Sequence, residues 1–217
     1  MVIFLKKKII IIIFMCLLLC GCKSVQQMSI QEIIDKGTNK TVNVYNTYRK
    51  GYKYNLPKGL GVLNSSDYNE VIMTGNYKYY LYIDAVSYYN KVIETYEVRD
   101  NCYYSKPISF EDRYGYIEIN EVGKDKYLIE IMYNYAKIEV IVKKADINVT
   151  VANAISVLTS IKFNDNVLKK MLEEETSQFG DMEFNIFETA SENSEYLQAM
   201  EENVYKDDKI HDSDLID

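Results

Sequence analysis

Nucleophilic chemistry has few candidate residues in this chain of 217 residues. Three of the four cysteines lie within the first 22 residues, Cys102 stands alone, and the single histidine, His211, lies near the C-terminal end. A thiol needs a nearby base, usually histidine, to become a thiolate at neutral pH. The pattern therefore favours a structural Cys102 at a strand end and argues against a Ser-His-Asp hydrolase or a histidine-rich zinc site.

Carboxylate chemistry has two candidate places, the adjacent acids Glu111-Asp112 and Asp207-Asp208. A hydrolase that uses carboxylates alone needs two of them facing each other in a cleft, about 5–9.5 Å apart. Adjacent acids in a loop or a tail are ordinarily solvated surface. We therefore expect no catalytic residue, no metal site and no cofactor, since the ligand spacing of a calcium loop is also missing around Asp212 and Asp214.

The N-terminus has the composition of a secretory signal. Lys6, Lys7 and Lys8 precede an unbroken apolar run from Ile9 to Leu19, which ends at Cys20-Gly21-Cys22. Eleven residues cover only about half of a ~30 Å hydrocarbon core, so a membrane-spanning helix is disfavoured. A plain signal peptide or an uncleaved anchor is the alternative interpretation.

The end of this segment, Leu19-Cys20-Gly21-Cys22, resembles the lipobox of bacterial lipoproteins. The resemblance implies a diacylglycerol on the Cys22 sulfur and cleavage after Gly21. Cys20 fits the pattern less well, because bulky Leu19 would occupy the position of the small residue. Two acyl chains give stable anchoring. The resemblance thus implies a protein on the extracytoplasmic face of the cell membrane, with the membrane as its first partner.

Charge is distributed unevenly along the chain. Residues 23–163 hold 18 basic and 16 acidic side chains, whereas residues 164–217 hold 4 and 16. A nucleic-acid-binding protein needs a basic face, so this balance argues against nucleic acid as a partner. Beyond Thr176 the acidic sequence predicts a mostly disordered tail, with docking of Phe184 and Phe187 on the domain as the open alternative.

Tyrosine is the compositional oddity, because 19 of 21 tyrosines lie between residues 45 and 135. A strand at 77–89 would place Tyr80, Tyr82 and Tyr88 on the face opposite Leu81 and Ile83. Ordinary strand propensity explains such residues. The functional interpretation is an exposed aromatic platform that binds a glycan or a partner protein.

The periodicities predict an α+β fold, an antiparallel β-meander with one main amphipathic helix packed on it. Strands are expected at 116–122, 127–133 and 137–143, with turns at 123–125 and 134–135 between them. A helix at 146–161 follows, with Asp146 as its N-cap and with Ile155 and Leu158 at the centre of its apolar stripe, and residues 160–163 are expected to form a last short strand. A short helix from Ser29, closed by Gly37, belongs to the expected tether. The expected parts are a signal peptide (1–21), the lipidated cysteine and tether (22–43), the α+β domain (44–163), a short helix (164–175) and the acidic tail (176–217).

The order of elements in the body resembles PsbP-like domains. The opening Tyr52-Lys53-Tyr54-Asn55-Leu56-Pro57-Lys58-Gly59, the sheet, and the late helix that leads to Ser160-Ile161-Lys162-Phe163 carry this resemblance. It implies an αβα sandwich-type fold and a binding or assembly role, and it transfers no functional residue. We expect a lipoprotein that acts as a non-catalytic binding or assembly module; a carboxylate-dependent enzyme and a purely structural envelope component are the alternatives.

Overall fold

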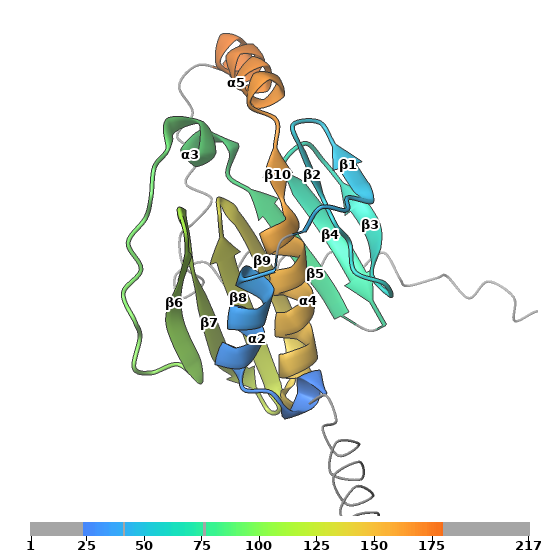
Figure 1. Ribbon diagram of the computed structural model, residues 1–217, viewed down its shortest axis with the longest axis vertical. Helices are drawn as coiled ribbons and strands as arrows, with labels where there is room; N and C mark the ends of the chain where they lie inside the picture. Colours follow the sequence, from blue (N-terminus) through green and yellow to red (C-terminus); the bar gives the residue numbers. More distant parts are fainter. Residues whose placement is uncertain (1–23, 41, 76, 180–217) are drawn as a thin grey trace, which may run out of the picture.

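The computed structural model describes residues 24–40, 42–75 and 77–179. An antiparallel sheet of seven strands forms its centre, in the order β3-β4-β5-β9-β8-β7-β6 (Figure 1). The strands are β3 (Gly61–Ser65), β4 (Asn69–Thr74), β5 (Tyr77–Ile83), β6 (Tyr104–Phe110), β7 (Arg113–Gly123), β8 (Lys126–Tyr133) and β9 (Ala136–Lys143). The expectation of an α+β fold with an antiparallel meander is confirmed.

Two-residue turns connect the strands of the meander. Asn134 and Tyr135 join β8 to β9 with φ values of 52° and 63°. Two successive positive φ values are the signature of a type I′ turn, whose twist matches that of the strands on either side. Lys124 and Asp125 make the opposite turn between β7 and β8, at the place where the sequence indicated one.

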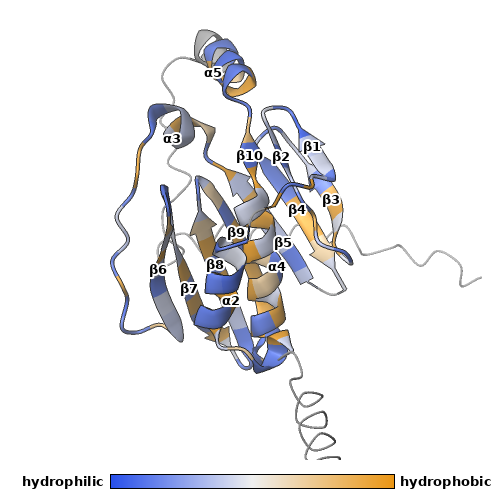
Figure 2. Ribbon diagram, in the orientation of Figure 1, coloured by the Kyte–Doolittle hydropathy of each residue, from blue (hydrophilic) through white to orange (hydrophobic). Residues whose placement is uncertain are grey.

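The helix α4 (Ile147–Ser160) crosses one face of this sheet (Figure 2). Its hydrophobic residues share the main core with those of the central strands β8 and β9. Ile155 and Leu158, the centre of the predicted stripe, are buried. Asp146 occupies the N-cap position of α4 as predicted, but its side chain accepts no hydrogen bond from the backbone N–H groups of the helix. It ends the short 3-10 helix η2 (Lys144–Asp146), and its carboxylate accepts a hydrogen bond of 2.6 Å from the Tyr77 hydroxyl.

The helix α2 (Ile30–Thr38) packs beside α4 in the same layer. Ser29 caps it as predicted, in a reciprocal capping box with Glu32. Two expectations are wrong here. Gly37 lies inside the helix, and the segment belongs to the domain instead of a tether, because Ile33 and Ile34 are buried in the main core.

A second sheet of three strands lies at the side of α4, formed by β1 (Thr47–Arg49), β2 (Tyr52–Tyr54) and β10 (Lys162–Phe163). The strand β10 is the last short strand that the sequence indicated after the main helix. The helix α5 (Asp165–Phe179) follows it directly. It extends four residues beyond the predicted end at 175, and residues 180–217, which hold most of the predicted acidic tail, lie outside the described residues.

The strand predicted at 77–89 ends at Ile83. Asp84 accepts a hydrogen bond from the Ser87 backbone N–H and starts the helix α3 (Ala85–Asn90). A carboxylate that satisfies a free N–H at a helix start favours helix over strand. Tyr88 therefore lies on a helix, and its predicted place on the strand face with Tyr80 and Tyr82 is wrong.

The sheet face opposite α4 is covered in part by the strap, which we define as residues 91–103, between α3 and β6. The Tyr96 ring stacks on Tyr116 of β7, with centroids 4.3 Å apart and planes 4° from parallel. Under the strap, Glu118, Glu130 and Glu139 lie side by side on three neighbouring strands.

None of the helices in the described part of the chain is long and apolar enough to cross a membrane.

Candidate functional site

A cleft of about 1240 Å³ opens at the end of the domain where α4 meets β10. The β1–β2 hairpin, the β10–α5 junction, the end of α3 and two turns of the large sheet form its walls. The chain order brings these segments together, because the antiparallel hairpins present their turns at the same end. We call this hollow the cationic cleft.

Charge distinguishes the cationic cleft from the rest of the near-neutral domain. Six lining residues are Lys or Arg and two are Asp. The basic ones are Arg49, Lys50, Lys53, Lys91, Arg113 and Lys162. Cations gathered in a concave site focus their field and attract anions.

Lys53 and Lys162 make the most informative pair in the cleft. They are directly opposite each other in the antiparallel register of β2 and β10. Like charges in such a pair are destabilising by roughly 0.2–1 kcal/mol. The Lys53 ammonium lies 4.4 Å from the centroid of the Tyr45 ring, while Lys162 has neither an ion pair nor a hydrogen bond among the described residues.

Arg113 adds a third available cation. It is half-buried at the start of β7, and its guanidinium makes no ion pair with a described residue. Lys91, at the end of α3, lies with its ammonium 3.8 Å from the Tyr88 ring centroid. Such a cation keeps its donors directed outward while the ring screens one side of it.

The aromatic floor of the cleft is formed by Tyr88, Tyr135 and Phe163. The Tyr88 ring lies 4.1 Å from Phe163 and meets Tyr135 edge-on at 5.5 Å between centroids. Its hydroxyl donates a hydrogen bond of 2.5 Å to the Asp165 carboxylate. Burial and this carboxylate raise the pKa of Tyr88 to about 12, so the phenol stays neutral as a donor.

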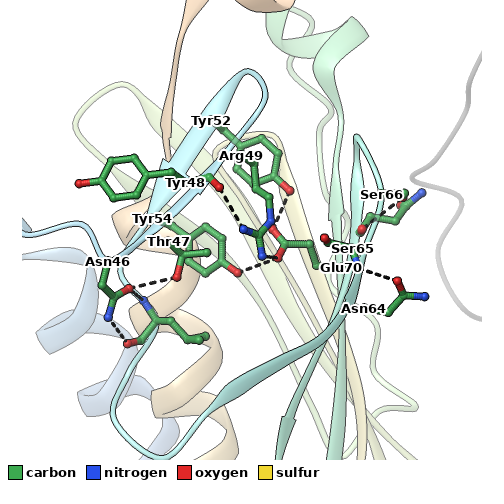
Figure 3. Close-up of polar contacts among 12 residues, drawn as sticks. Asn46, Thr47, Tyr48, Arg49, Tyr52, Tyr54, Asn64, Ser65, Ser66 and Glu70 are labelled. Carbon is green, nitrogen blue, oxygen red and sulfur yellow. Dashed lines mark hydrogen bonds and ion pairs between the residues drawn. The ribbon is translucent and has the colours of Figure 1, made fainter.

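Arg49, in the wall of the cleft, is paired with a buried carboxylate. Glu70 of β4 accepts hydrogen bonds from the Arg49 guanidinium at 2.7 Å and from the hydroxyls of Tyr52 and Tyr54 at 2.7 and 3.0 Å (Figure 3). Desolvation and the Glu70 charge raise the pKa of both phenols. This cluster fastens the small sheet to the large one and thereby positions the cleft wall that carries Lys53.

The tyrosines singled out in the sequence lie in separate places. Tyr80 is buried, with an exposed fraction of 6%, and Tyr82 is half-buried next to it on the face opposite α4. The expected exposed platform is therefore absent at these positions. Tyr88 does line the cationic cleft, although from a helix. Cys22 lies outside the described residues.

Carboxylates also lie where sequence reasoning did not place them. The row Glu118, Glu130 and Glu139 is buried, and each member has a donor: Tyr96 and Arg99 for Glu118, Tyr116 for Glu130, and Lys137 for Glu139. The contacts of Glu118 join the strap to the sheet, whereas those of Glu130 and Glu139 lie within the sheet. Of the predicted acid pairs, Glu111-Asp112 forms the β6–β7 turn, with Asp112 in the cleft wall, and Asp207-Asp208 lies outside the described residues.

Cys102 is half-buried at the end of the strap, two residues before β6. Burial, and then the Glu118 charge, raise the pKa of its thiol. A raised pKa lowers the thiolate fraction at neutral pH, which agrees with the structural role expected for it.

The cationic cleft itself was missed in the sequence. Its only local signal is the pair of basic segments Arg49-Lys50 and Lys53, which are close in the chain; Arg113 and Lys162 join them solely through the fold. Comparison with known proteins adds no analogy, since no family model, no curated protein and no solved structure matches this chain.

Proposed function

We propose that this protein is a lipid-anchored binding module on the extracytoplasmic face of the cell membrane, and that it binds an anionic ligand in the cationic cleft. The observation that carries the proposal is the cross-strand pair of Lys53 and Lys162 in the cationic cleft. This pairing costs stability, and an anion seated between the two ammonium groups would offset that cost.

The anchor rests on the N-terminal sequence. Lys6 to Lys8, the apolar run and Leu19-Cys20-Gly21-Cys22 support lipidation at Cys22. Cys22→Ala is expected to release the protein from the membrane fraction or to leave an uncleaved precursor, while Cys20→Ala is processed normally. Intact-mass analysis of the mature protein decides the point, because an unmodified Cys22 would contradict the anchor.

Anion binding is tested with polyphosphate on the full mature chain in which Cys22 is replaced by Ser. A ligand that binds only the folded state stabilises it by RT ln(1 + [L]/Kd) and so raises the unfolding midpoint as its concentration increases. We expect polyphosphate to raise the thermal midpoint at constant ionic strength. Lys162→Gln should weaken the binding about tenfold and yet leave the free protein as stable or up to ~1 kcal/mol more stable.

For Lys162→Gln we thus expect the affinity for polyphosphate to fall while the stability of the free protein stays the same or rises, and this combination distinguishes a binding role from a structural one. A lysine with a purely structural role would lose stability when replaced, and its replacement would not change anion affinity. Lys124→Gln, on the turn at the opposite end of the sheet, removes the same charge and serves as the control. Equal polyphosphate affinity in the wild type, Lys162→Gln and Lys124→Gln would refute the proposal.

A further inference from the structure

The attachment end of the domain can be located from its first described residues. The 3-10 helix η1 (Val25–Gln27) begins three residues after Cys22. The Asn148 side-chain amide, at the start of α4, donates hydrogen bonds to the backbone carbonyls of Gln26 and Met28 at 3.3 and 2.8 Å. Ser24, the first described residue, is two positions after Cys22, and two residues of extended chain span at most about 7 Å. A lipid on Cys22 would therefore hold the N-terminal end of α4 close to the membrane surface.

The cationic cleft lies at the other end of the same helix. The lining residues Ile161 and Phe163 follow the last turn of α4, whereas η1 contacts its first turns, and Figure 1 shows η1 and β10 at opposite ends. The 14 residues of α4 extend about 21 Å at 1.5 Å per residue. The Debye length at physiological salt is about 8 Å. The charge of the anchoring membrane is thus screened over more than two Debye lengths before it reaches Lys162.

The size and lining of the cleft indicate how large its ligand is and which groups it carries. Its volume of about 1240 Å³ exceeds the ~300–1,000 Å³ that small-molecule pockets occupy. It is open at the surface, where Tyr48 presents 64% of its area to solvent within the lining. Aromatic rings with a polar edge offer flat apolar area to a ligand that is itself partly polar.

Resting on the function proposed above, we infer that the cationic cleft opens away from the membrane and binds a segment of an anionic glycan of the envelope. Sugar rings would lie on Tyr48, and the anionic groups would contact Lys53 and Lys162, which share one face of the small sheet with Tyr48 in the register of β1, β2 and β10. Headgroups of the anchoring membrane do not fit, because the cleft is at the far end of α4 from the anchor.

The chemical class of the ligand is tested by measuring the binding of three polymers at constant ionic strength. Dextran has sugar rings without charge, polyphosphate has charge without rings, and dextran sulfate has both. We expect Lys162→Gln to weaken polyphosphate and dextran sulfate about tenfold each. Tyr48→Ser should weaken dextran sulfate about fivefold and leave polyphosphate unchanged. Dextran should not bind measurably.

The outcomes separate this inference from the proposed function. If polyphosphate binding depends on Lys162 but Tyr48→Ser has no selective effect on dextran sulfate, the anion site stands and the glycan inference fails. If no polymer binding depends on Lys162, both fail. A single-stranded oligonucleotide that binds more tightly than dextran sulfate, in a Lys162-dependent manner, would also overturn the glycan inference.

Orientation is tested separately with the lipidated chain in vesicles that contain brominated lipids. The chain has no tryptophan, so a single introduced one reports on its own surroundings. We expect Tyr48→Trp fluorescence to be unquenched and Gln26→Trp fluorescence to be quenched, because the exposed Gln26 is next to the anchor. Quenching of both, or flotation of the soluble Cys22→Ser protein with anionic vesicles through Lys162, would overturn the membrane-distal site.

Discussion

Gly37 of α2 lies against Ile155 of α4 so closely that a Cβ at position 37 would be 2.2 Å from the Ile155 Cγ2 atom. The two helices approach through this point, and Ile155 is almost completely buried, with 1% exposure. The glycine is therefore needed for the contact between helices and not for a turn, since it lies inside α2.

Gly37→Ala should destabilise the domain. Helix propensity alone would add up to ~1 kcal/mol of stability, but overpacking in a filled core costs about 1–3 kcal/mol. The crowded atom is close to the Ile155 backbone and cannot turn away. We expect a net loss in the free energy of unfolding, measured by denaturant titration.

The control for this substitution is Gly61→Ala. Gly61 has no atom within 4 Å of an added Cβ and lies on the edge strand β3. It should change stability by a few tenths of a kcal/mol at most. Ile155→Ala should remove most of the additional cost of Gly37→Ala in the double variant, since the two residues touch. Strict additivity would show that the helices do not meet at this point.

Glu70→Ala tests the cluster that fastens the small sheet to β4. Its removal leaves the Arg49 guanidinium and the hydroxyls of Tyr52 and Tyr54 without their acceptor. Breaking a buried ion pair on one side costs roughly 3–5 kcal/mol. We expect the lower end, because 24% of the Arg49 side chain is exposed.

Chemical denaturation of Glu70→Ala beside Glu121→Ala measures this cost. Glu121 is exposed on β7, so its replacement should be close to neutral. Because Arg49 and Tyr52 also line the cationic cleft, Glu70→Ala should weaken polyphosphate binding by displacing the wall that holds Lys53. A loss of stability equal to that of Glu121→Ala would show that the cluster does not fasten the two sheets.

How much of this arrangement the sequence could predict depends on how local its determinants are. The stripe that contains Ile155 and Leu158 repeats along one helix, so α4 could be predicted, as could the turns of the meander. At Asp84, two local signals compete. The alternation of residue types that begins at Tyr77 continues in the sequence beyond Asp84, but Asp84 is the N-cap of α3 and ends the strand. Strand alternation is overridden when a carboxylate can satisfy a helix start.

The candidate site could not be predicted, because its determinants are distant in the chain. Lys53 meets Lys162 through a pairing between β2 and β10 that spans more than a hundred residues. The glutamates that alternate with apolar residues on β7, β8 and β9 are buried, on the sheet face that the strap covers in part. Neither a long-range pairing nor the cover of a sheet face is encoded in a local period.

Alkaline pH should unfold the domain through its buried phenols. Burial and nearby carboxylates raise the pKa of Tyr52 and Tyr116 above the ordinary value near 10, and that of Tyr96 to about 12. The unfolded chain releases these protons first and so binds fewer of them. Stability is therefore fully present below pH ~10 and falls as the pH rises through the folded-state values.

This dependence is measured by following tyrosinate absorbance and far-ultraviolet circular dichroism in one titration. The last phenols should ionise together with the loss of secondary structure. Tyr116→Phe removes one such group while keeping its ring against Tyr96. Complete ionisation of all tyrosines while the dichroism remains native would contradict the burial of these hydroxyls.

Glu118→Gln should loosen the strap without unfolding the sheet. The Glu118 carboxylate accepts a hydrogen bond of 2.8 Å from the Tyr96 hydroxyl and pairs with Arg99 at 3.5 Å, and both partners belong to residues 91–103. An amide retains one acceptor for Tyr96 but leaves the Arg99 charge without its anion. Amide hydrogen exchange should therefore accelerate within the strap, while protection in α4 stays unchanged.

Glu97→Gln is the control, because it removes a charge from the strap itself at an exposed position, and it should leave the exchange rates of the strap unchanged. If Glu118→Gln and Glu97→Gln behave alike, the ion pair does not hold the strap, and the stacking of Tyr96 on Tyr116 and the hydrogen bonds to Ser105 of β6 hold it instead.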